Sequence, residues 1–228
     1  MITDAHNHLQ QLPAPTLDGT GVDRCTTCGT SPADWQSVLD LAAADPRITP
    51  AIGLHPWFIT TTTDDWLELL ATLLESNATC TVGEIGLDKT RHAPPLPDQL
   101  PVLISQLELA ARLDRPATLH CVRAHGTLLD TLTDSPLPAR GLLLHSYAGA
   151  PEMIPRYLAL PVPVYLSLSS PDLIPHIPHD RLLLESDATR KNQRTPAHVH
   201  PLYHQPSIDP TQITTNYQNL FPQPAPLG

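Results

Sequence analysis

Glycine, aromatic residues and lysine are scarce in this chain of 228 residues, which has 10 glycines, 4% aromatic residues and two lysines, Lys89 and Lys191. The low glycine content excludes a collagen-like chain, so we interpret the 27 prolines as rigid connections between elements. Basic residues number 13 against 23 acidic ones, for a net charge of −10. This shortage of positive charge argues against a protein that holds duplex DNA through a broad basic surface.

Long apolar runs and the features of a secretion signal are also missing. No apolar run approaches the roughly 20 residues that span a membrane, and residues 1–6 show neither a basic nor an apolar signal segment. Cys25 and Cys28 have CxxC spacing, but a redox pair usually opens a helix and no second pair completes a zinc site. We interpret the four cysteines as small buried side chains. A cytoplasmic protein without a membrane segment is expected.

Eight short apolar runs are predicted to be β-strands. Leu142–Leu144 and Leu182–Leu184 are apolar throughout, as expected for parallel strands that are buried on both faces. The predicted strands are Ile2–Ala5, Val22–Cys28, Thr49–Leu54, Thr79–Ile85, Ala117–Cys121, Gly141–His145, Pro163–Leu168 and Arg181–Glu185. Apolar residues three and four positions apart, together with a cap at Ser31–Pro32, predict helices between them. The predicted helices are Trp35–Ala44, Asp64–Ser76, Gln99–Leu113, Ala124–Leu132 and Pro210–Leu220.

This alternation of strands and helices predicts an α/β fold, a TIM-like (β/α)8 barrel formed by one domain over residues 1–228. About 28 residues are available for each strand and its crossover, which is close to the minimum. The connections Leu9–Gly21 and Pro171–Asp180 are too short for a full helix and contain several prolines. We therefore expect a trimmed barrel in which one or two crossover helices are shortened or missing.

Candidate metal ligands stand at the ends of five predicted strands. His6 and His8 are two residues apart, so both side chains of an extended strand point to the same side. The carboxyl ends of barrel strands meet at the face that carries barrel active sites. The six candidate ligands are His6, His8, Glu84, His120, His145 and Asp187.

These ligands exceed the needs of one zinc ion and suit two divalent ions about 3.5–4 Å apart. Glu84 is the expected bridge between the ions, and Asp187 is expected both to bind an ion and to accept a proton from the attacking water. Such a mixed set accepts Mg²⁺, Mn²⁺ or Zn²⁺. The histidines that are expected to lie in loops or on helices without binding metal are His92, His125, His176, His179, His198, His200 and His204.

Six segments follow one another in an order that resembles the TatD-type metal-dependent hydrolases, a family of the amidohydrolase-like barrel superfamily. They are Asp4–His8 (DAHNH), Gly53–Trp57 (GLHPW), Val82–Asp88 (VGEIGLD), His120–Ala124 (HCVRA), His145–Gly149 (HSYAG) and Leu183–Ala188 (LLESDA). The segment Thr215–Phe221 is similar to the closing helix of the family. The resemblance implies a TIM-like barrel and a divalent-metal-dependent hydrolase of a family typically described as deoxyribonucleases.

The resemblance also implies roles for single residues. The ligands of one ion would be His6, His8, Glu84 and Asp187, and those of the other Glu84, His120 and His145. His55 matches a position near the substrate phosphate. Arg123 matches a commonly basic position, where it would either orient a phosphate or pair with an acidic neighbour. The chain departs from the family pattern in its shorter length, in Lys89, and in the loop that follows Asp187.

Three functions compete on these grounds. The leading one is hydrolysis of phosphodiesters at DNA ends or in single strands, with DNA as a transient substrate. The second is hydrolysis of a C–N or ester bond in a small molecule or an aminoacyl-tRNA ester. The third is a metal-binding barrel without catalysis, which the complete ligand set disfavours. Glu84 on the fourth strand, where many two-metal amidohydrolases use a modified lysine, favours the phosphodiesterase.

Overall fold

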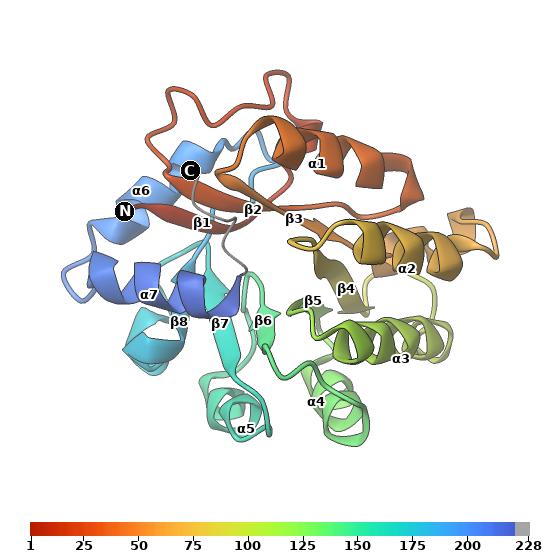
Figure 1. Ribbon diagram of the computed structural model, residues 1–228. Coiled ribbons are helices and arrows are strands. Elements are labelled where there is room, and N and C mark those ends of the chain that lie inside the picture. The colour runs from red at the N-terminus through yellow and green to blue at the C-terminus, as the bar shows by residue number, and fades with distance from the viewer. Residues whose placement is uncertain (222–228) are drawn as a thin grey trace.

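The computed structural model describes residues 1–221, in which eight parallel strands follow one another in sequence order around a buried core (Figure 1). Residues 222–228, the end of the expected domain, lie outside the described residues. The strands are β1 (Thr3–Asn7), β2 (Arg24–Cys28), β3 (Ile48–Ile52), β4 (Thr81–Asp88), β5 (Ala117–Val122), β6 (Leu142–Leu144), β7 (Val164–Leu168) and β8 (Leu182–Leu184). All eight predicted strands are confirmed, with small shifts at their ends.

The first strand and the residues after the last strand bring the two ends of the sheet together. The backbone N–H of Asp187 donates to the carbonyl of His6 at 3.0 Å, and that of His8 donates to the carbonyl of Ala188 at 2.9 Å. The buried carboxylate of Asp4 accepts hydrogen bonds from the backbone N–H and the hydroxyl of Ser186, at 2.8 and 2.7 Å. The barrel is therefore nearly closed, and the predicted (β/α)8 fold is confirmed.

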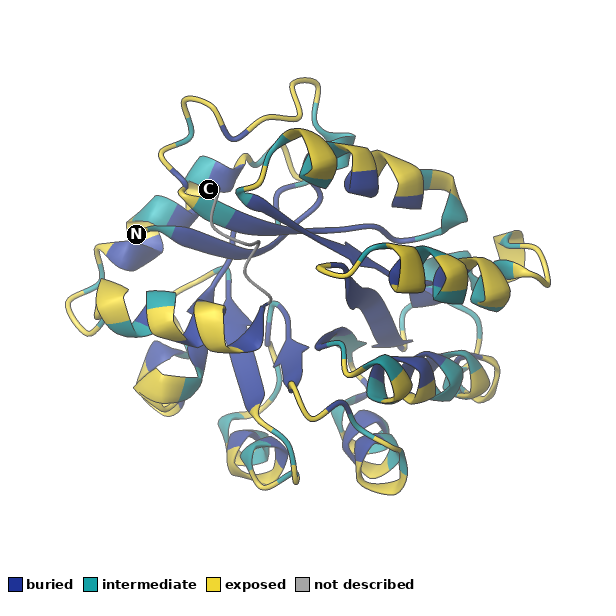
Figure 2. Ribbon diagram, viewed as in Figure 1, coloured by how far each residue is buried: buried dark blue, intermediate teal, exposed yellow. Residues whose placement is uncertain are grey.

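Helices surround the strands, with their buried faces inward and their exposed faces outward (Figure 2). They are α1 (Pro32–Ala44), α2 (Trp66–Ser76), α3 (Leu96–Leu113), α4 (His125–Asp134), α5 (Ile154–Leu158), α6 (His200–Tyr203) and α7 (Pro210–Leu220). Helix α1 begins as its sequence predicts, because Ser31 and Asp34 form a capping box and Pro32 occupies the first turn. Within residues 1–221, no helix is both long enough and apolar enough to cross a bilayer.

Two crossovers lack an α-helix, as their length and proline content predict. The connection from β1 to β2 contains a single 3₁₀ turn, Leu9–Gln11. The connection from β7 to β8 contains two such turns, Ile174–His176 and His179–Arg181. The trimmed barrel is confirmed at both places. Helices α5 and α6, which are short and contain proline, were not predicted.

The interior of the barrel is filled by apolar side chains. The Leu142–Leu144 and Leu182–Leu184 runs are at most 1% exposed, as predicted for strands covered on both faces. Beneath α1, the indole of Trp35 is fully buried, and its N–H donates to the carbonyl of Gly53 at 2.9 Å. All four cysteines are free thiols; three are buried and Cys121 is half-buried.

The closing helix α7 is attached to β8 through one buried amide. Asn216 is 1% exposed, and its side-chain N–H₂ donates to the carbonyls of His179 and Leu182, each at 2.8 Å. On the same helix, the hydroxyl of Tyr217 lies 3.0 Å from that of Thr26 on β2. These contacts fix the helix across the edge of the barrel that has lost its last crossover helix.

We expect Asn216→Ala to lower the free energy of unfolding by about 1–3 kcal/mol, because the buried carbonyl of Leu182 and the more exposed carbonyl of His179 both lose their donor. Asn219→Ala is the matched control, since Asn219 lies on the exposed face of the same helix. Chemical denaturation of both variants measures the difference. Equal stabilities for the two would show that the amide does not hold α7 in place.

Candidate metal centre

The carboxylate of Glu84 lies at the centre of a histidine cluster. Glu84 is on β4 and is 3% exposed. Its Oε1 atom lies 2.7 Å from Nε2 of His145, 2.8 Å from Nδ1 of His120 and 3.4 Å from Nε2 of His55. Three imidazoles from the ends of β3, β5 and β6 therefore face one oxygen of the carboxylate.

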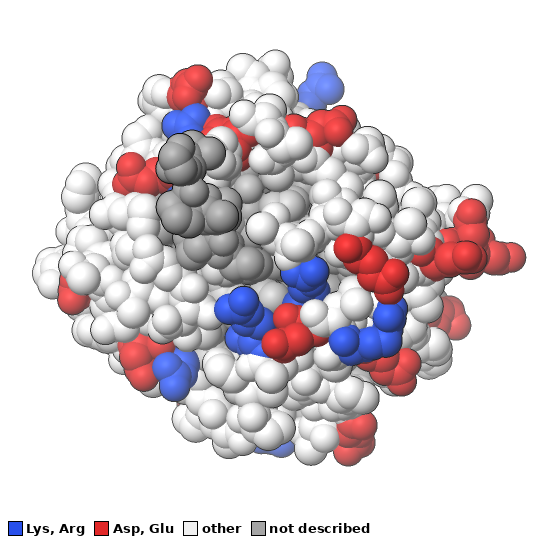
Figure 3. Space-filling model, viewed as in Figure 1, with Lys and Arg blue, Asp and Glu red and all other residues white. Residues whose placement is uncertain are grey.

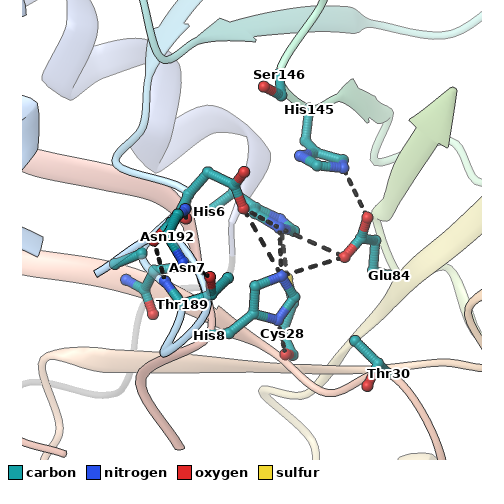
Figure 4. Close-up of polar contacts among 12 residues, drawn as sticks. His6, Asn7, His8, Cys28, Thr30, Glu84, His145, Ser146, Thr189 and Asn192 are labelled. Carbon is teal, nitrogen blue, oxygen red and sulfur yellow. Dashed lines mark hydrogen bonds and ion pairs between the residues drawn. The ribbon is translucent and has the colours of Figure 1, made fainter. Parts of the chain in front are cut away.

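The second oxygen of Glu84 faces the histidines of β1. Its Oε2 atom lies 3.3 Å from Nε2 of His8 and 3.6 Å from Nε2 of His6 (Figure 4). Nδ1 of His8 donates to the carbonyl of Cys28 at 2.8 Å, which leaves Nε2 available as a ligand atom. Oδ1 of Asp187 lies 3.8 Å from His8 Nε2 and 3.9 Å from His6 Nε2. The two oxygens of Glu84 thus separate the ligands into two groups.

This donor set fits divalent cations. Imidazole nitrogens and carboxylate oxygens are ligands that zinc and manganese accept. Three groups of side chains place their ligand atoms within 4.8 Å of one another: His6, His8 and Asp187; His6, Glu84 and His145; and His55, Glu84 and His120. The structure therefore brings all six predicted ligands together. His55, for which the family resemblance implies a place near the substrate phosphate, lies within the same cluster.

Two further carboxylates stand behind the histidines, and neither was predicted. Oδ2 of Asp88 lies 3.1 Å from Nε2 of His120. Oε1 of Glu185 lies 3.5 Å from Nδ1 of His145, and the other oxygen of Glu185 accepts a hydrogen bond from the hydroxyl of Ser167. Carboxylates in such places orient imidazoles toward a metal. The sequence did offer one clue to these two acids, because Asp88 lies in the same segment as Glu84 and Glu185 in the same segment as Asp187.

The charges of the cluster favour an ionised Glu84. Burial raises the pKa of this carboxyl group, but the charges of His145 and His55 and the hydrogen bond from His120 outweigh burial and hold its pKa well below the usual range. Burial raises the pKa of Asp187, against the opposing effect of His145. A buried anion between imidazoles is a favourable place for a divalent cation.

The backbone around the site adopts conformations that are costly elsewhere. Three non-glycine residues that follow strands have left-handed φ angles: 56° at Arg123, 43° at Ser146 and 47° at Asp187. Such residues cost about 1–3 kcal/mol each and cluster at functional sites. Gly86 pairs with His120 across β4 and β5, and a Cβ at Gly86 would lie 2.0 Å from the carbonyl oxygen of His120. Glycine is therefore required for β4 to approach β5 beside Glu84.

Two cavities open beside the cluster and share His120, His145 and Asp187. The first has a volume of about 500 Å³ and is also lined by His55, Trp57 and other residues. The second has a volume of about 540 Å³, and the exposed Arg123 lies in its wall. His55 and Arg123, both predicted to contact substrate, therefore line different cavities.

Known proteins of the same kind match this chain over most of its length. The family model described as "TatD related DNase" matches residues 3–209. The "Uncharacterized metal-dependent hydrolase YjjV" of Escherichia coli (strain K12) is 33% identical over 203 residues, which cover 81% of this chain and 78% of that protein. The "3'-5' ssDNA/RNA exonuclease TatD" of Erwinia billingiae is 31% identical over 178 residues, which cover 74% of this chain and 68% of that protein.

Solved structures agree with these matches. The crystal structure of YjjV, a TatD homologue from Escherichia coli K12, superimposes with a TM-score of 0.85 at 26% identity and covers 98% of both chains. A TatD-family hydrolase from Entamoeba histolytica has the same fold, with a TM-score of 0.76 at 14% identity. The sequence match over residues 3–209, together with the barrel and its histidine cluster, shows that the chain belongs to the family of TatD-related DNases, which are metal-dependent hydrolases.

Proposed function

We propose that this protein is a phosphodiesterase that uses two divalent cations to hydrolyse DNA at its ends or in single strands. The observation that carries the proposal is the position of Glu84, whose two oxygens face two separate groups of ligands. Relatives that carry the name 3'-5' ssDNA/RNA exonuclease support the choice of a nucleic acid as substrate. Mg²⁺, Mn²⁺ and Zn²⁺ are all compatible with the ligands.

Each cation has its own ligands in this proposal, and Glu84 belongs to both. The ligands of the first cation are His6, His8, Glu84 and Asp187, and those of the second are Glu84, His120 and His145. When bound, such ions lower the pKa of a water molecule and neutralise the charge on the phosphoryl oxygens. Asp88 and Glu185 orient the histidines of the second group from behind.

Asp187 accepts the proton of the attacking water at its carboxylate. Its side chain is 32% exposed, whereas the side chain of Glu84 is 4% exposed, so Asp187 is the carboxylate of the site that water reaches. The backbone of Asp187 is fixed by two hydrogen bonds, in which its N–H donates to His6 and its carbonyl accepts from the side chain of Asn192 at 2.6 Å. A fixed base at the solvent side of the cluster suits proton transfer.

Arg123 and His55 contact the substrate from the two cavities. Arg123 is exposed in the wall of the second cavity, where its guanidinium is free to approach a phosphate. On the face seen in Figure 3, basic side chains form small groups among acidic ones and no continuous basic surface is visible. Because the net charge of −10 repels a phosphate, cations held by the cluster and the nearby Arg123 would attract it, and binding of DNA is expected to be weak and sensitive to salt.

Glu84→Ala is expected to abolish binding of the paired cations, because one substitution removes a ligand of both groups. Metal analysis after dialysis against Mn²⁺ or Zn²⁺ measures the loss directly, and the rise in melting temperature on adding metal should disappear with it. Glu108→Ala on the exposed face of α3 is the matched control. Unchanged metal content and unchanged turnover in Glu84→Ala would refute the bridging role.

Glu185→Gln should weaken metal binding about 10- to 100-fold, because it removes the charge behind His145 while it keeps the size of the side chain. Calorimetric titration of the protein with Mn²⁺ or Zn²⁺ measures this change in metal affinity without any assay of activity. Glu152→Gln, which alters an exposed residue outside the cluster, provides the comparison. If the metal affinities of the two variants match, Glu185 does not position His145.

The catalytic proposal is tested on end-labelled single- and double-stranded oligonucleotides, with Mg²⁺ or Mn²⁺ and with a chelator. We expect release of nucleotides that the chelator stops and that Asp187→Asn slows about 10²- to 10⁴-fold, because the proton acceptor is lost. Asp172→Asn, at an exposed site beyond β7, is the control for a charge change alone. A folded, metal-loaded protein that releases no nucleotide would refute the proposal and favour hydrolysis of a small-molecule or aminoacyl ester.

A further inference from the structure

Two of the few aromatic side chains in this chain lie in the wall of the first cavity. The chain has three Trp, five Tyr and two Phe residues. Seven of these ten are buried in the core: Trp35, Tyr147, Tyr157, Tyr165, Tyr203, Tyr217 and Phe221. The other three are half-buried, and two of them, Trp57 and Phe58, line the cavity beside Glu84. Aromatic surface that the core does not bury is therefore concentrated at the candidate active site.

The indole of Trp57 is held at its edge by a hydrogen bond, and an exposed cation covers one of its faces. Its N–H donates to Oδ2 of Asp88 at 2.6 Å, which fixes the plane of the ring. The ammonium of Lys191 lies 5.3 Å from the ring centroid, above the ring, and the exposed Lys191 lines the same cavity. A cation–π contact at an exposed site is weak, so another group can displace the lysine at little cost.

The second cavity has a different chemistry. Among the described residues that line it there is no Trp, Tyr or Phe, and Arg123, His125 and Ser146 contribute polar groups. A nucleotide presents a flat, apolar base on one side and a charged phosphate on the other. The aromatic wall of the first cavity therefore suits a base, whereas the polar wall of the second, adjoining cavity suits a sugar and phosphate.

We infer that the face of Trp57 is a stacking platform for the nucleobase next to the scissile phosphate, and that Lys191 occupies this face until a base replaces it. The inference rests on the phosphodiesterase function proposed above. On displacement, the ammonium pairs with the phosphate of the stacked nucleotide. Stacking on an aromatic ring does not depend on the identity of the base, since every base has a π-face. The subsite therefore accepts all four bases.

Trp57 also acts on the metal centre through its edge. Oδ2 of Asp88 accepts the indole N–H and contacts His120. The ring face and the ring edge therefore have separable roles, which Trp57→Phe and Trp57→Leu distinguish. Phenylalanine keeps an aromatic face and loses the N–H, whereas leucine loses both.

The experiment measures binding of deoxyadenosine, dAMP and inorganic phosphate to the metal-loaded protein by calorimetry. We expect Trp57→Leu to bind deoxyadenosine on the order of tenfold more weakly than Trp57→Phe and to bind phosphate as tightly as Trp57→Phe does, because both variants lack the N–H and only leucine lacks the aromatic face. Trp57→Phe should retain most of the affinity for deoxyadenosine. Lys191→Met should weaken the binding of dAMP but not that of deoxyadenosine, because only dAMP has a phosphate for the ammonium to pair with. Trp66→Phe, at the half-buried tryptophan outside the cavity, is the matched control and should change nothing.

A second measurement uses tryptophan fluorescence in a variant whose cavity residues are all unchanged. In Trp66→Phe the remaining tryptophans are Trp57 and the fully buried Trp35, so quenching of fluorescence by deoxyadenosine reports on Trp57. Absence of quenching, or equal affinities for deoxyadenosine in Trp57→Leu and the unmodified protein, would overturn the platform.

Equal losses of affinity for deoxyadenosine in Trp57→Phe and Trp57→Leu would also overturn the stacking platform. The loss would then arise from the missing N–H to Asp88 and not from the missing aromatic face. Failure of the platform is separate from failure of the enzyme. Cleavage of oligonucleotides without binding of deoxyadenosine rejects the platform and keeps the phosphodiesterase. Binding of deoxyadenosine at Trp57 without any cleavage keeps a base-binding site and rejects the catalytic proposal.

Discussion

One buried carboxylate determines the arrangement of the whole centre. A carboxylate as deeply buried as Glu84 is stable only when positive or hydrogen-bonding groups surround it. Here five imidazoles lie within 3.6 Å of its oxygens, and they come from the ends of β1, β3, β5 and β6. No single strand or hairpin could supply these partners. The cluster therefore depends on a sheet that curves far enough to bring the first strand close to the fourth and the sixth.

This requirement explains which parts of the barrel have been trimmed. The crossovers after β1 and β7 have lost their helices, but the polar contacts that close the sheet are intact. Asp4 bonds to Ser186 across the closure, and Asn216 attaches α7 to the start of β8. Helices on the outside of a barrel can be replaced by other cover, whereas loss of closure would separate His6 and His8 from Glu84. The barrel therefore lacks two of its outer helices but retains the hydrogen bonds that keep the histidine cluster together.

The elements of the barrel and the convergence of the six candidate ligands could be predicted from the sequence because both follow simple rules. Apolar runs such as Leu142–Leu144 mark buried strands, and the carboxyl ends of parallel strands converge on one face. The same rules place His55 only at the mouth of the barrel, since its depth beside Glu84 depends on side-chain rotamers. The roles of Asp88 and Glu185 were missed for a related reason: whether a buried acid faces a histidine or solvent is a property of packing. The contact of Lys191 with Trp57 joins two loops, and no periodic pattern encodes it.

The difference between the two cavities bears on how an acidic protein would hold a nucleic acid. A protein that binds the length of a duplex through many lysines and arginines gains its affinity from the release of counterions. This chain has few basic residues near the cluster, of which Arg123 and Lys191 line the cavities. Cations bound at Glu84 would hold a single phosphate, and an aromatic face would hold a base without any net charge. In the proposed function, such a site would bind one or two nucleotides at the end of a chain and would have little affinity for the length of a duplex, in keeping with the net charge of −10.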